Sequence, residues 1–302
     1  MSTWDVILQQ AVNGLILGSF YALVALGYSM VYGIIKLLNF AHGDIYMTGA
    51  FVCLSVFGVL SRVLAGWGGI ACSIVAAMFL AGILGWLAQR FAYRPLLGAP
   101  RLSLLITAIG VSLVIYNSVM AITKSKPLFF ESGLDNMAGV KIGSITITYI
   151  QMVLLGISAL VMLGLTLFIG RTKTGKAMRA IALDQDTCRL MGVNVHKVIG
   201  LTFVLGSALA AIAGGMACIY YGNVQYNMGY TIGIKAFTAA VIGGIGSIPG
   251  AMLGGLLLGL LEAAGTQLLD SSWKDVFAFG LLILMLVLRP NGLLGKSEVE
   301  RM

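Results

Sequence analysis

Charged residues are scarce in this chain. Only 10% of its 302 residues are charged and 59% are hydrophobic, with a mean hydropathy of +0.98, whereas roughly 25% of an average soluble domain is charged. This composition excludes a water-soluble fold. Proline is also rare, with 5 residues against 40 glycines. That balance excludes a proline-rich linker protein and is typical of membrane helices that pack closely through small residues.

Residues that carry catalysis or metal chemistry are few and scattered. The two histidines, His42 and His196, are far apart, and no Ser/His/Asp set is recognisable. The four cysteines show no C-x-x-C spacing, so neither a disulfide nor a metal site is predicted. The net charge of +8 does not indicate nucleic-acid binding, because the Lys and Arg residues lie in loops between apolar runs. We expect no catalytic residues, metal or cofactor in this chain.

One string imitates a nucleotide-binding loop. Gly170, Gly175 and Lys176 form G-x-x-x-x-G-K, but Ala177 stands where a P-loop needs a Ser or Thr hydroxyl for magnesium. The string also follows an apolar helical run instead of a buried strand. We therefore expect no nucleotide to bind here.

Long charge-free stretches predict membrane-spanning helices, since about 20 apolar residues cross the hydrocarbon layer. Two further stretches, 28–42 and 229–246, are interrupted by glycine and are interpreted as short, broken crossings or re-entrant segments. The sequence predicts an all-α polytopic bundle with eight clear spans plus two short glycine-broken ones, about ten crossings, in a single transmembrane domain over residues 1–302. The clear runs are 6–35, 45–61, 63–89, 102–123, 142–170, 198–234, 236–261 and 276–288.

Charge asymmetry predicts the orientation. Segment 171–197 carries six basic residues against Asp184 and Asp186, and the loop near Arg90 and Arg94 has no acid, so both should be cytoplasmic. A cytoplasmic C-terminal tail then requires 229–246 to cross. A crossing at 28–42 would place the N-terminus inside, and without it the N-terminus lies outside.

The cytoplasmic segment 171–197 also predicts two short helices. Thr174 is expected to cap the first, over 175–183, and Asp186 to cap the second, through Leu190, with Gly192 as a left-handed stop before Asn194. A rigid pair of helices would let a motor protein outside the membrane push on the spans. An ordinary cytosolic loop is the alternative.

Glycines and isolated polar residues mark the second half of the chain. Gly246, Gly250 and Gly254 recur every fourth residue, and Gly255 and Gly259 repeat the spacing, which favours close helix packing on one side of a helix over substrate contact. Lys235 and Glu262 flank this stripe and either pair structurally or line a pathway. Further polar groups inside apolar runs are Asn13, Asn39, His42, Asp44, Asn117 and Gln267.

Three stretches carry a family resemblance. They are NGLILGSFYALVALGYSMVYGIIKLLNFAHGDIYMTGAF at 13–51, RTKTGKAMRA with MGVN within 171–194, and KAFTAAVIGGIGSIPGAMLGG at 235–255. Over nearly its whole length the chain resembles the shorter permease of the branched-chain amino acid ABC importers, the LivH type.

The resemblance implies a type II importer permease of the bacterial inner membrane that works by alternating access. Its partners would be a second, longer permease, two cytoplasmic ATPase subunits that use the ATP, and a periplasmic amino-acid-binding protein. It implies a coupling region, which falls here on Gly175, Arg179, Asp184, Asp186, Leu190, Gly192 and Asn194. Candidate pathway residues are Asn39, His42, Lys235 and Glu262.

The cargo implied is leucine, isoleucine or valine. An importer of the same architecture that carries another amino acid, urea or a sugar is one alternative. A stand-alone secondary transporter is another, and it would place paired ionisable residues at mid-membrane and need no docking element.

Overall fold

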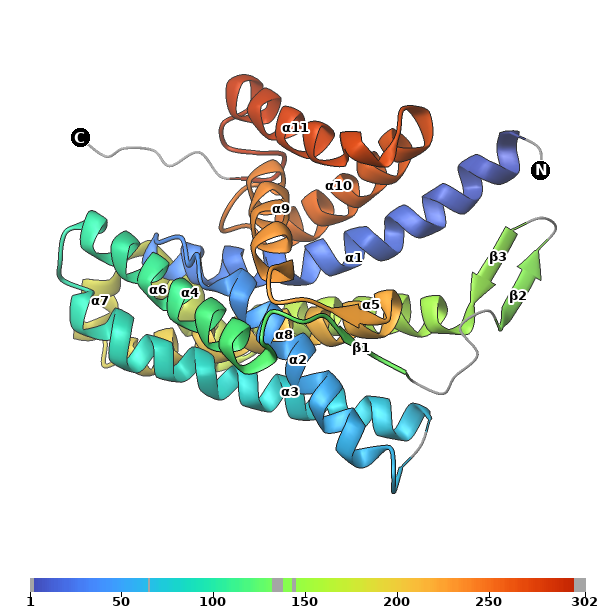
Figure 1. Ribbon diagram of the computed structural model, residues 1–302. Helices are drawn as coiled ribbons and strands as arrows, with labels where there is room; N and C mark the ends of the chain where they lie inside the picture. The colour runs from blue at the N-terminus through green and yellow to red at the C-terminus, as the bar shows by residue number, and fades with distance from the viewer. Residues whose placement is uncertain (1–2, 65, 132–137, 143–144, 296–302) are drawn as a thin grey trace.

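The computed structural model describes residues 3–64, 66–131, 138–142 and 145–295, and helices dominate this part of the chain (Figure 1). Helix α3, Trp67–Leu87, is extended by a π-helical turn, Ala88–Tyr93, and a 3-10 turn, Arg94–Leu96. Four short strands, β1 Leu128–Phe129, β2 Gly139–Ile142, β3 Ile145–Thr148 and β4 Asn223–Val224, lie in the connections. The α-helices are α1 Thr3–Ile35, α2 His42–Leu60, α3 Trp67–Leu87, α4 Arg101–Thr123, α5 Tyr149–Arg171, α6 Lys173–Leu183, α7 Gln185–Leu190, α8 Val195–Tyr221, α9 Met228–Gly243, α10 Ile248–Leu268 and α11 Lys274–Leu288.

Within the described residues, seven helices are long and apolar enough to cross a membrane: α1, α2, extended α3, α4, α5, α8 and α10. Helices α9 and α11 are shorter, at 16 and 15 residues. The predicted all-α polytopic class is confirmed, and the chain is a multi-pass membrane protein.

The predicted crossing at 28–42 is wrong. Helix α1 continues through Tyr28 to Ile35 without interruption, and residues 36–41 form only the link to α2. Gly33, the glycine within this range, does not break α1, because a membrane helix keeps its own backbone hydrogen bonds. It instead lies beside Gly246, whose Cα would be 3.5 Å from a Cβ at position 33.

The two ends of the bundle differ in charge. At one end α1 begins beside the β2–β3 hairpin, in which Gly139 pairs with Thr148, and Gln9 exchanges two hydrogen bonds with the backbone of Thr146 (Figure 1). At the other end lie α6, α7 and the basic turn after α3. The positive-inside rule associates such basic loops with the cytoplasmic side, and the start of α1 lies at the opposite end. The tail from residue 296 onward lies outside the described residues.

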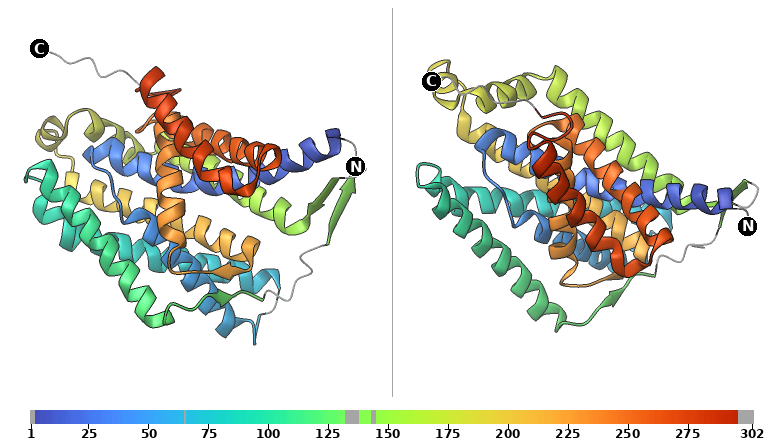
Figure 2. Two further views of the ribbon diagram at one scale, coloured as in Figure 1. Left: turned by 45° about the horizontal axis from the view of Figure 1, so that its top comes forward. Right: turned by 90° about the horizontal axis from the view of Figure 1, so that it is seen from above.

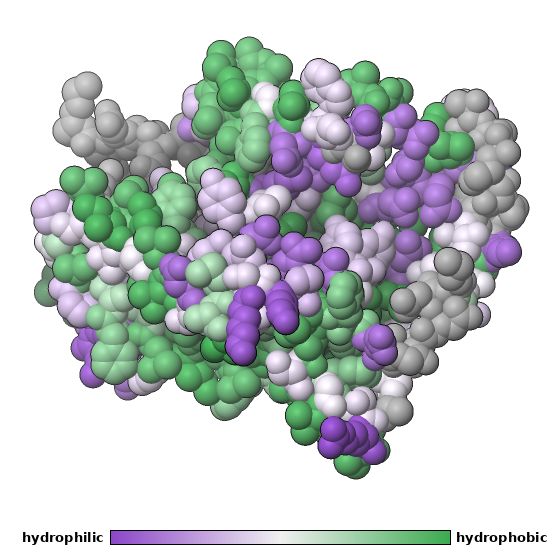
Figure 3. Space-filling view, in the orientation of Figure 1, coloured by the Kyte–Doolittle hydropathy of each residue, from purple (hydrophilic) through white to green (hydrophobic). Residues whose placement is uncertain are grey.

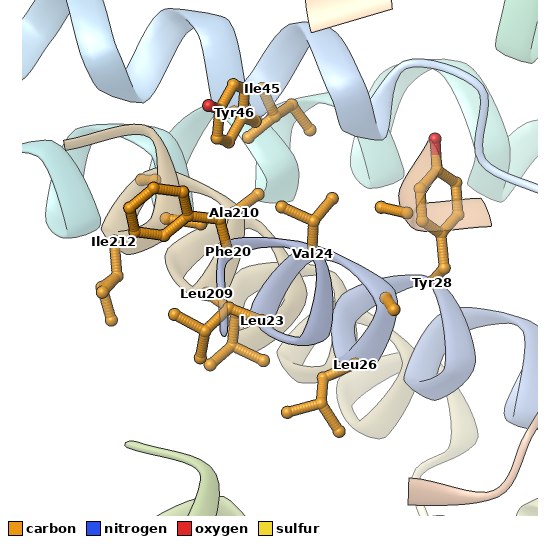
Figure 4. Close-up of a cluster of buried hydrophobic side chains, with 14 of the residues drawn as sticks. Phe20, Leu23, Val24, Leu26, Tyr28, Ile45, Tyr46, Leu209, Ala210 and Ile212 are labelled. Carbon is orange, nitrogen blue, oxygen red and sulfur yellow. The ribbon is translucent and has the colours of Figure 1, made fainter. Parts of the chain in front are cut away.

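Helices α1 and α8 run through the centre of the molecule (Figure 2). Their buried side chains form one cluster with those of α2, in which Phe20 and Val24 of α1 lie near Tyr46 of α2 and Ala210 of α8 (Figure 4). Helices α4 and α5 lie at the periphery.

Helix α9 crosses the other helices instead of running along them (Figures 1 and 2). After α8 ends at Tyr221, Val224 of β4 pairs with Leu128 of β1, and the chain then enters the bundle before α9 begins at Met228. Gly229 packs against Gly43 at the start of α2. The four helices expected after residue 197 are present, and the second of them, α9, is this short transverse helix.

The glycine stripe lies on two faces of α10. A Cβ at Gly254 would lie 2.0 Å from the carbonyl oxygen of Ala239 in α9, and one at Gly259 would lie 2.2 Å from the backbone nitrogen of Gly18 in α1. Gly250 likewise meets Gly243 of α9. The expectation of a single side is therefore corrected, because neighbouring residues are about 100° apart around a helix. Gly246 is not part of the stripe, since it lies in the turn before α10 with φ +89°.

Candidate functional site

Two short helices, α6 and α7, form segment 171–197, but their caps differ from the predicted ones. The Thr172 hydroxyl accepts a hydrogen bond from Gly175 N at 3.0 Å and caps α6, whereas Thr174 lies inside the helix. Asp184 caps α7, accepting hydrogen bonds from the backbone N–H groups of Asp186 and Thr187 at 2.9 and 3.1 Å. Both caps lie two residues earlier than predicted, because α5 ends at Arg171 and leaves Thr172 extended.

Gly175 and Arg179 fasten α6 to the end of α5. A Cβ at Gly175 would lie 2.3 Å from the carbonyl oxygen of Ile169. The Arg179 guanidinium donates to the carbonyl oxygens of Ile169 and, at 3.2 Å, Gly170. A cation there suits the negative end of the α5 dipole. These two residues therefore hold α6 in place.

Helix α7 is fastened at both ends and exposes apolar side chains. Gln185 donates to the carbonyl oxygen of Ile34 at the end of α1, at 3.0 Å. After α7, Gly192 is left-handed with φ +80°, and Asn194 caps α8 by accepting from Lys197 N at 3.1 Å. Leu190 is 89% exposed, and the side chains of Leu183 and Met191 are also largely exposed. Apolar side chains that are exposed together in a segment rich in charge indicate a partner contact.

Asp184 has a perturbed acidity in this segment. Hydrogen bonds from the Thr187 hydroxyl and the backbone N–H groups of Thr187 and Asp186 hold the pKa of Asp184 below its usual value. The cap is therefore ionised at neutral pH.

An ionic cluster lies inside the bundle. Lys235 Nζ of α9 lies 2.8 Å from Glu262 Oε1 of α10 and 2.8 Å from Asp275 Oδ1 of α11. Glu262 Oε2 accepts a hydrogen bond from the Tyr21 hydroxyl of α1 at 2.8 Å. Glu262 is 1% exposed, so a buried carboxylate is neutralised by a buried ammonium. The structure thus brings together two of the four predicted pathway residues.

A polar cavity of about 360 Å³ borders this cluster. Lys235 and Glu262 line it together with Tyr46, Asn227 and Thr231. The Tyr46 hydroxyl is buried and has no hydrogen-bond partner among the described residues. The cavity therefore offers a polar solute an unused hydroxyl beside an ion pair whose charges are already satisfied within the protein.

The other two predicted pathway residues lie elsewhere. Asn39 Oδ1 accepts a hydrogen bond from the Tyr93 hydroxyl at 2.7 Å, and the His42 ring contacts the Tyr28 ring at a centroid distance of 4.8 Å. Both side chains are buried, and neither borders the cavities described here. Their contacts fasten the link between α1 and α2.

Asp44 belongs to a second cavity, and sequence reasoning left it out of the pathway set. This cavity of about 500 Å³ lies between α2, α4 and α9. Asp44 Oδ2 accepts a hydrogen bond from the Ser112 hydroxyl of α4. The sequence signal that could have placed Asp44 in the pathway set is its carboxylate in the first turn of an apolar helix. The surface over α9 is correspondingly polar, with hydrophobic regions to its left and below (Figure 3).

Among the residues that the structure describes, no group of three or more His, Cys, Asp or Glu residues is placed to hold a metal ion.

Comparison with known proteins identifies the family. The chain is 48% identical to the high-affinity branched-chain amino acid transport system permease protein BraD of Pseudomonas aeruginosa, over 97% of each chain. It is 45% identical to the permease protein LivH of Escherichia coli K12 and 44% identical to that of Salmonella typhimurium, again over 97% of each chain. The model of the family described as branched-chain amino acid transport system, permease component, matches residues 10–286. The chain therefore belongs to this permease family.

Proposed function

We propose that this chain is the permease subunit of an ATP-driven importer that carries leucine, isoleucine and valine across the bacterial inner membrane. The observation that carries the proposal is the near full-length identity to high-affinity branched-chain amino acid permeases. The chain acts as one transmembrane domain and binds no cofactor. Its partners are a second permease, two cytoplasmic ATPase subunits that hydrolyse ATP, and a periplasmic amino-acid-binding protein.

The proposed topology has nine passes with the N-terminus outside. The seven long helices and α11 cross directly, and the short turn at 225–227 after β4 together with α9 makes the remaining, broken pass. Five of these passes, α1 to α5, precede α6, and this odd number agrees with the placement of the start of α1 and of α6 at opposite ends of the bundle (Figure 1).

The proposed coupling element is the pair α6 and α7. Exposed Leu183, Leu190 and Met191 supply a docking surface for an ATPase. Because Arg179 anchors α6 to α5 and Gln185 anchors α7 to α1, motion of the pair is passed to two spans. The solute then passes the polar cavity beside Lys235 and Glu262 during alternating access.

The test is uptake by the complete importer reconstituted in liposomes, with the binding protein outside and ATP within. We expect ATP-dependent leucine uptake that Arg179→Glu lowers about tenfold, because a reversed charge at the end of α5 is repelled there. Lys126→Glu, an equal charge change at the outward end, is the control and keeps normal uptake. Absence of ATP-dependent uptake of all three amino acids by the unaltered complex would refute the proposal.

Two alternatives predict different outcomes in the same assay. Another cargo would appear as stronger competition by urea, a sugar or an unrelated amino acid than by isoleucine or valine. A stand-alone secondary transporter is favoured by one observation, the ionisable pair Lys235 and Glu262 inside the bundle. It predicts uptake by this chain alone, driven by an ion gradient without ATP.

A further inference from the structure

The cavity that contains Asp44 lies near the middle of the membrane. Its wall on α4 is formed by Ile109, Ser112 and Leu113, which lie midway along Arg101–Thr123. Its volume of about 500 Å³ lies within the range of roughly 300–1,000 Å³ that is usual for small-molecule sites. The cavity is therefore large enough and deep enough to hold a small solute in transit.

Asp44 brings a negative charge that the protein does not neutralise. The residue is 4% exposed, and Ser112 donates the one side-chain hydrogen bond seen to its carboxylate among the described residues. No described basic side chain forms an ion pair with it. A carboxylate at this depth is costly without a counter-charge, so a cationic group that enters the cavity would be stabilised.

The start of α9 brings the opposite polarity to the same cavity. Asn227 provides no side-chain cap, and Gly229 and Tyr230 in the first turn line the cavity. Uncapped N–H groups and the positive end of the helix dipole favour an anionic group. The contact between Gly43 and Gly229, where a Cβ at Gly43 would lie 2.3 Å from the Gly229 carbonyl oxygen, places Asp44 beside this helix start.

The remaining wall is largely apolar, with Ile109, Leu113, Ile234 and Phe237. We propose that this cavity binds the zwitterion of an aliphatic amino acid in transit, with its ammonium at Asp44, its carboxylate at the first turn of α9 and its side chain on this wall. This inference rests on the proposed function and specifies where the cargo is held.

The cavity beside Lys235 is less suited to this role. There the ammonium of Lys235 already contacts Glu262 and Asp275, so its charge is satisfied within the protein. The Asp44 cavity offers one unneutralised carboxylate and one uncapped helix start, which together match both charges of an amino acid.

The first test measures the number of leucine molecules imported per ATP hydrolysed by the complete importer in liposomes, with saturating binding protein. Asp44→Asn should lower this ratio about tenfold or more, as expected for loss of one buried charged contact. A general folding defect lowers uptake and ATPase activity together and leaves the ratio unchanged. Asn117→Ala is the control, because Asn117 lies on α4, the helix of Ser112, is exposed and donates a hydrogen bond to the carbonyl oxygen of Leu113 in its own helix.

The second test changes the apolar wall. Ile109→Phe should lower leucine uptake relative to valine uptake by about tenfold, because the larger wall residue leaves less room for the longer side chain. Val114→Phe, exposed on the same helix and outside the cavity, should keep the normal ratio. If Asp44→Asn does not assemble, this selectivity ratio decides.

Normal ratios in both cavity variants would overturn the assignment, including the case in which a lipid or a partner side chain fills the cavity. The outcomes also separate the two proposals. If the unaltered complex imports no branched-chain amino acid, the proposed function fails. If the unaltered complex imports branched-chain amino acids and both cavity variants show its normal ratios, only the proposed binding site is wrong.

Discussion

Helices α1 and α4 are both long and apolar enough to cross a membrane, but they have opposite surroundings. The most apolar stretch of α1 is 89% buried inside the protein, whereas that of α4 is 6% buried. Glycine contacts account for much of this difference. Gly14 and Gly18 of α1 meet the backbone of α10, while Gly110 of α4 has no atom within 4 Å of a Cβ built on it. Hydropathy thus identifies a crossing, and close contacts at small residues decide whether it is central or peripheral.

The largest expected effect concerns the ion pair that α1 reaches through Tyr21. Lys235→Met leaves Glu262 as an unpaired buried charge, which should cost about 3–5 kcal/mol. Thermal unfolding of the purified complex in detergent measures this loss. Asn117→Ala on α4 should change stability little, because Asn117 is exposed and bonds its own helix.

A matched double variant controls for the lost lysine itself. Replacing both Lys235 and Glu262 with methionine removes the unpaired charge and should recover most of the stability without restoring transport. Equal unfolding temperatures for Lys235→Met and Asn117→Ala would contradict the claim that the buried ion pair contributes more to stability than the exposed surface of α4.

The second effect tests the glycine contacts directly. A Cβ at Gly18 would lie 2.8 Å from the Cα of Leu256 in α10, so Gly18→Leu should push the two helices apart and cost about 1–3 kcal/mol or more. Gly110→Leu meets open space on α4 and should stay within about 0.5 kcal/mol. The same unfolding assay compares the two, and a larger loss for Gly110→Leu would contradict the packing explanation.

A third, smaller effect extends the comparison to helices outside the membrane. Thr172→Ala removes the cap of α6 and should cost about 1 kcal/mol. Thr174→Ala, two residues along and inside the helix, should cost less. Hydrogen exchange of residues 173–183 measures the difference, and equal protection in both variants would show that α6 does not depend on this cap.

The smallest effect is the acid dependence of α7. The pKa of Asp184 is lowered in the folded protein, mainly by hydrogen bonds from Thr187. Its stabilising contribution is therefore complete above the ordinary aspartate pKa of about 3.9 and is lost as the pH falls through the lowered value. Hydrogen exchange of residues 185–190 should follow this fall, and Asp184→Asn should abolish it.

The sequence predicted the helices better than their boundaries. Apolar runs located all the long helices. The expectation that segment 171–197 and the C-terminal tail lie on the same side of the membrane required an even number of crossings between them and predicted four helices after residue 197. The extra crossing at 28–42 failed because glycine can either break a membrane helix or allow close packing, and Gly33 lies within α1 beside Gly246 without breaking the helix. Thr172 and Thr174 are equally able to cap, and only the end of α5 at Arg171 decides between them.

The candidate site was predicted in part. Lys235 and Glu262 were visible as polar residues in apolar runs, and the structure pairs them. Tyr21 and Asp275 were not singled out, because their relation to Glu262 depends on how α1 and α11 pack. The relation of Asp44 to the start of α9 likewise depends on the contact between Gly43 and Gly229.

The ion pairs of Lys235 impose an order on biogenesis. Its partners, Glu262 and Asp275, belong to helices that the ribosome makes after α9. At 16 residues, with a lysine among them, α9 is shorter than the roughly 20 apolar residues that cross a bilayer. We therefore expect α9 to be inserted together with α10 and α11, so that completion of the last two helices acts as a checkpoint for membrane assembly.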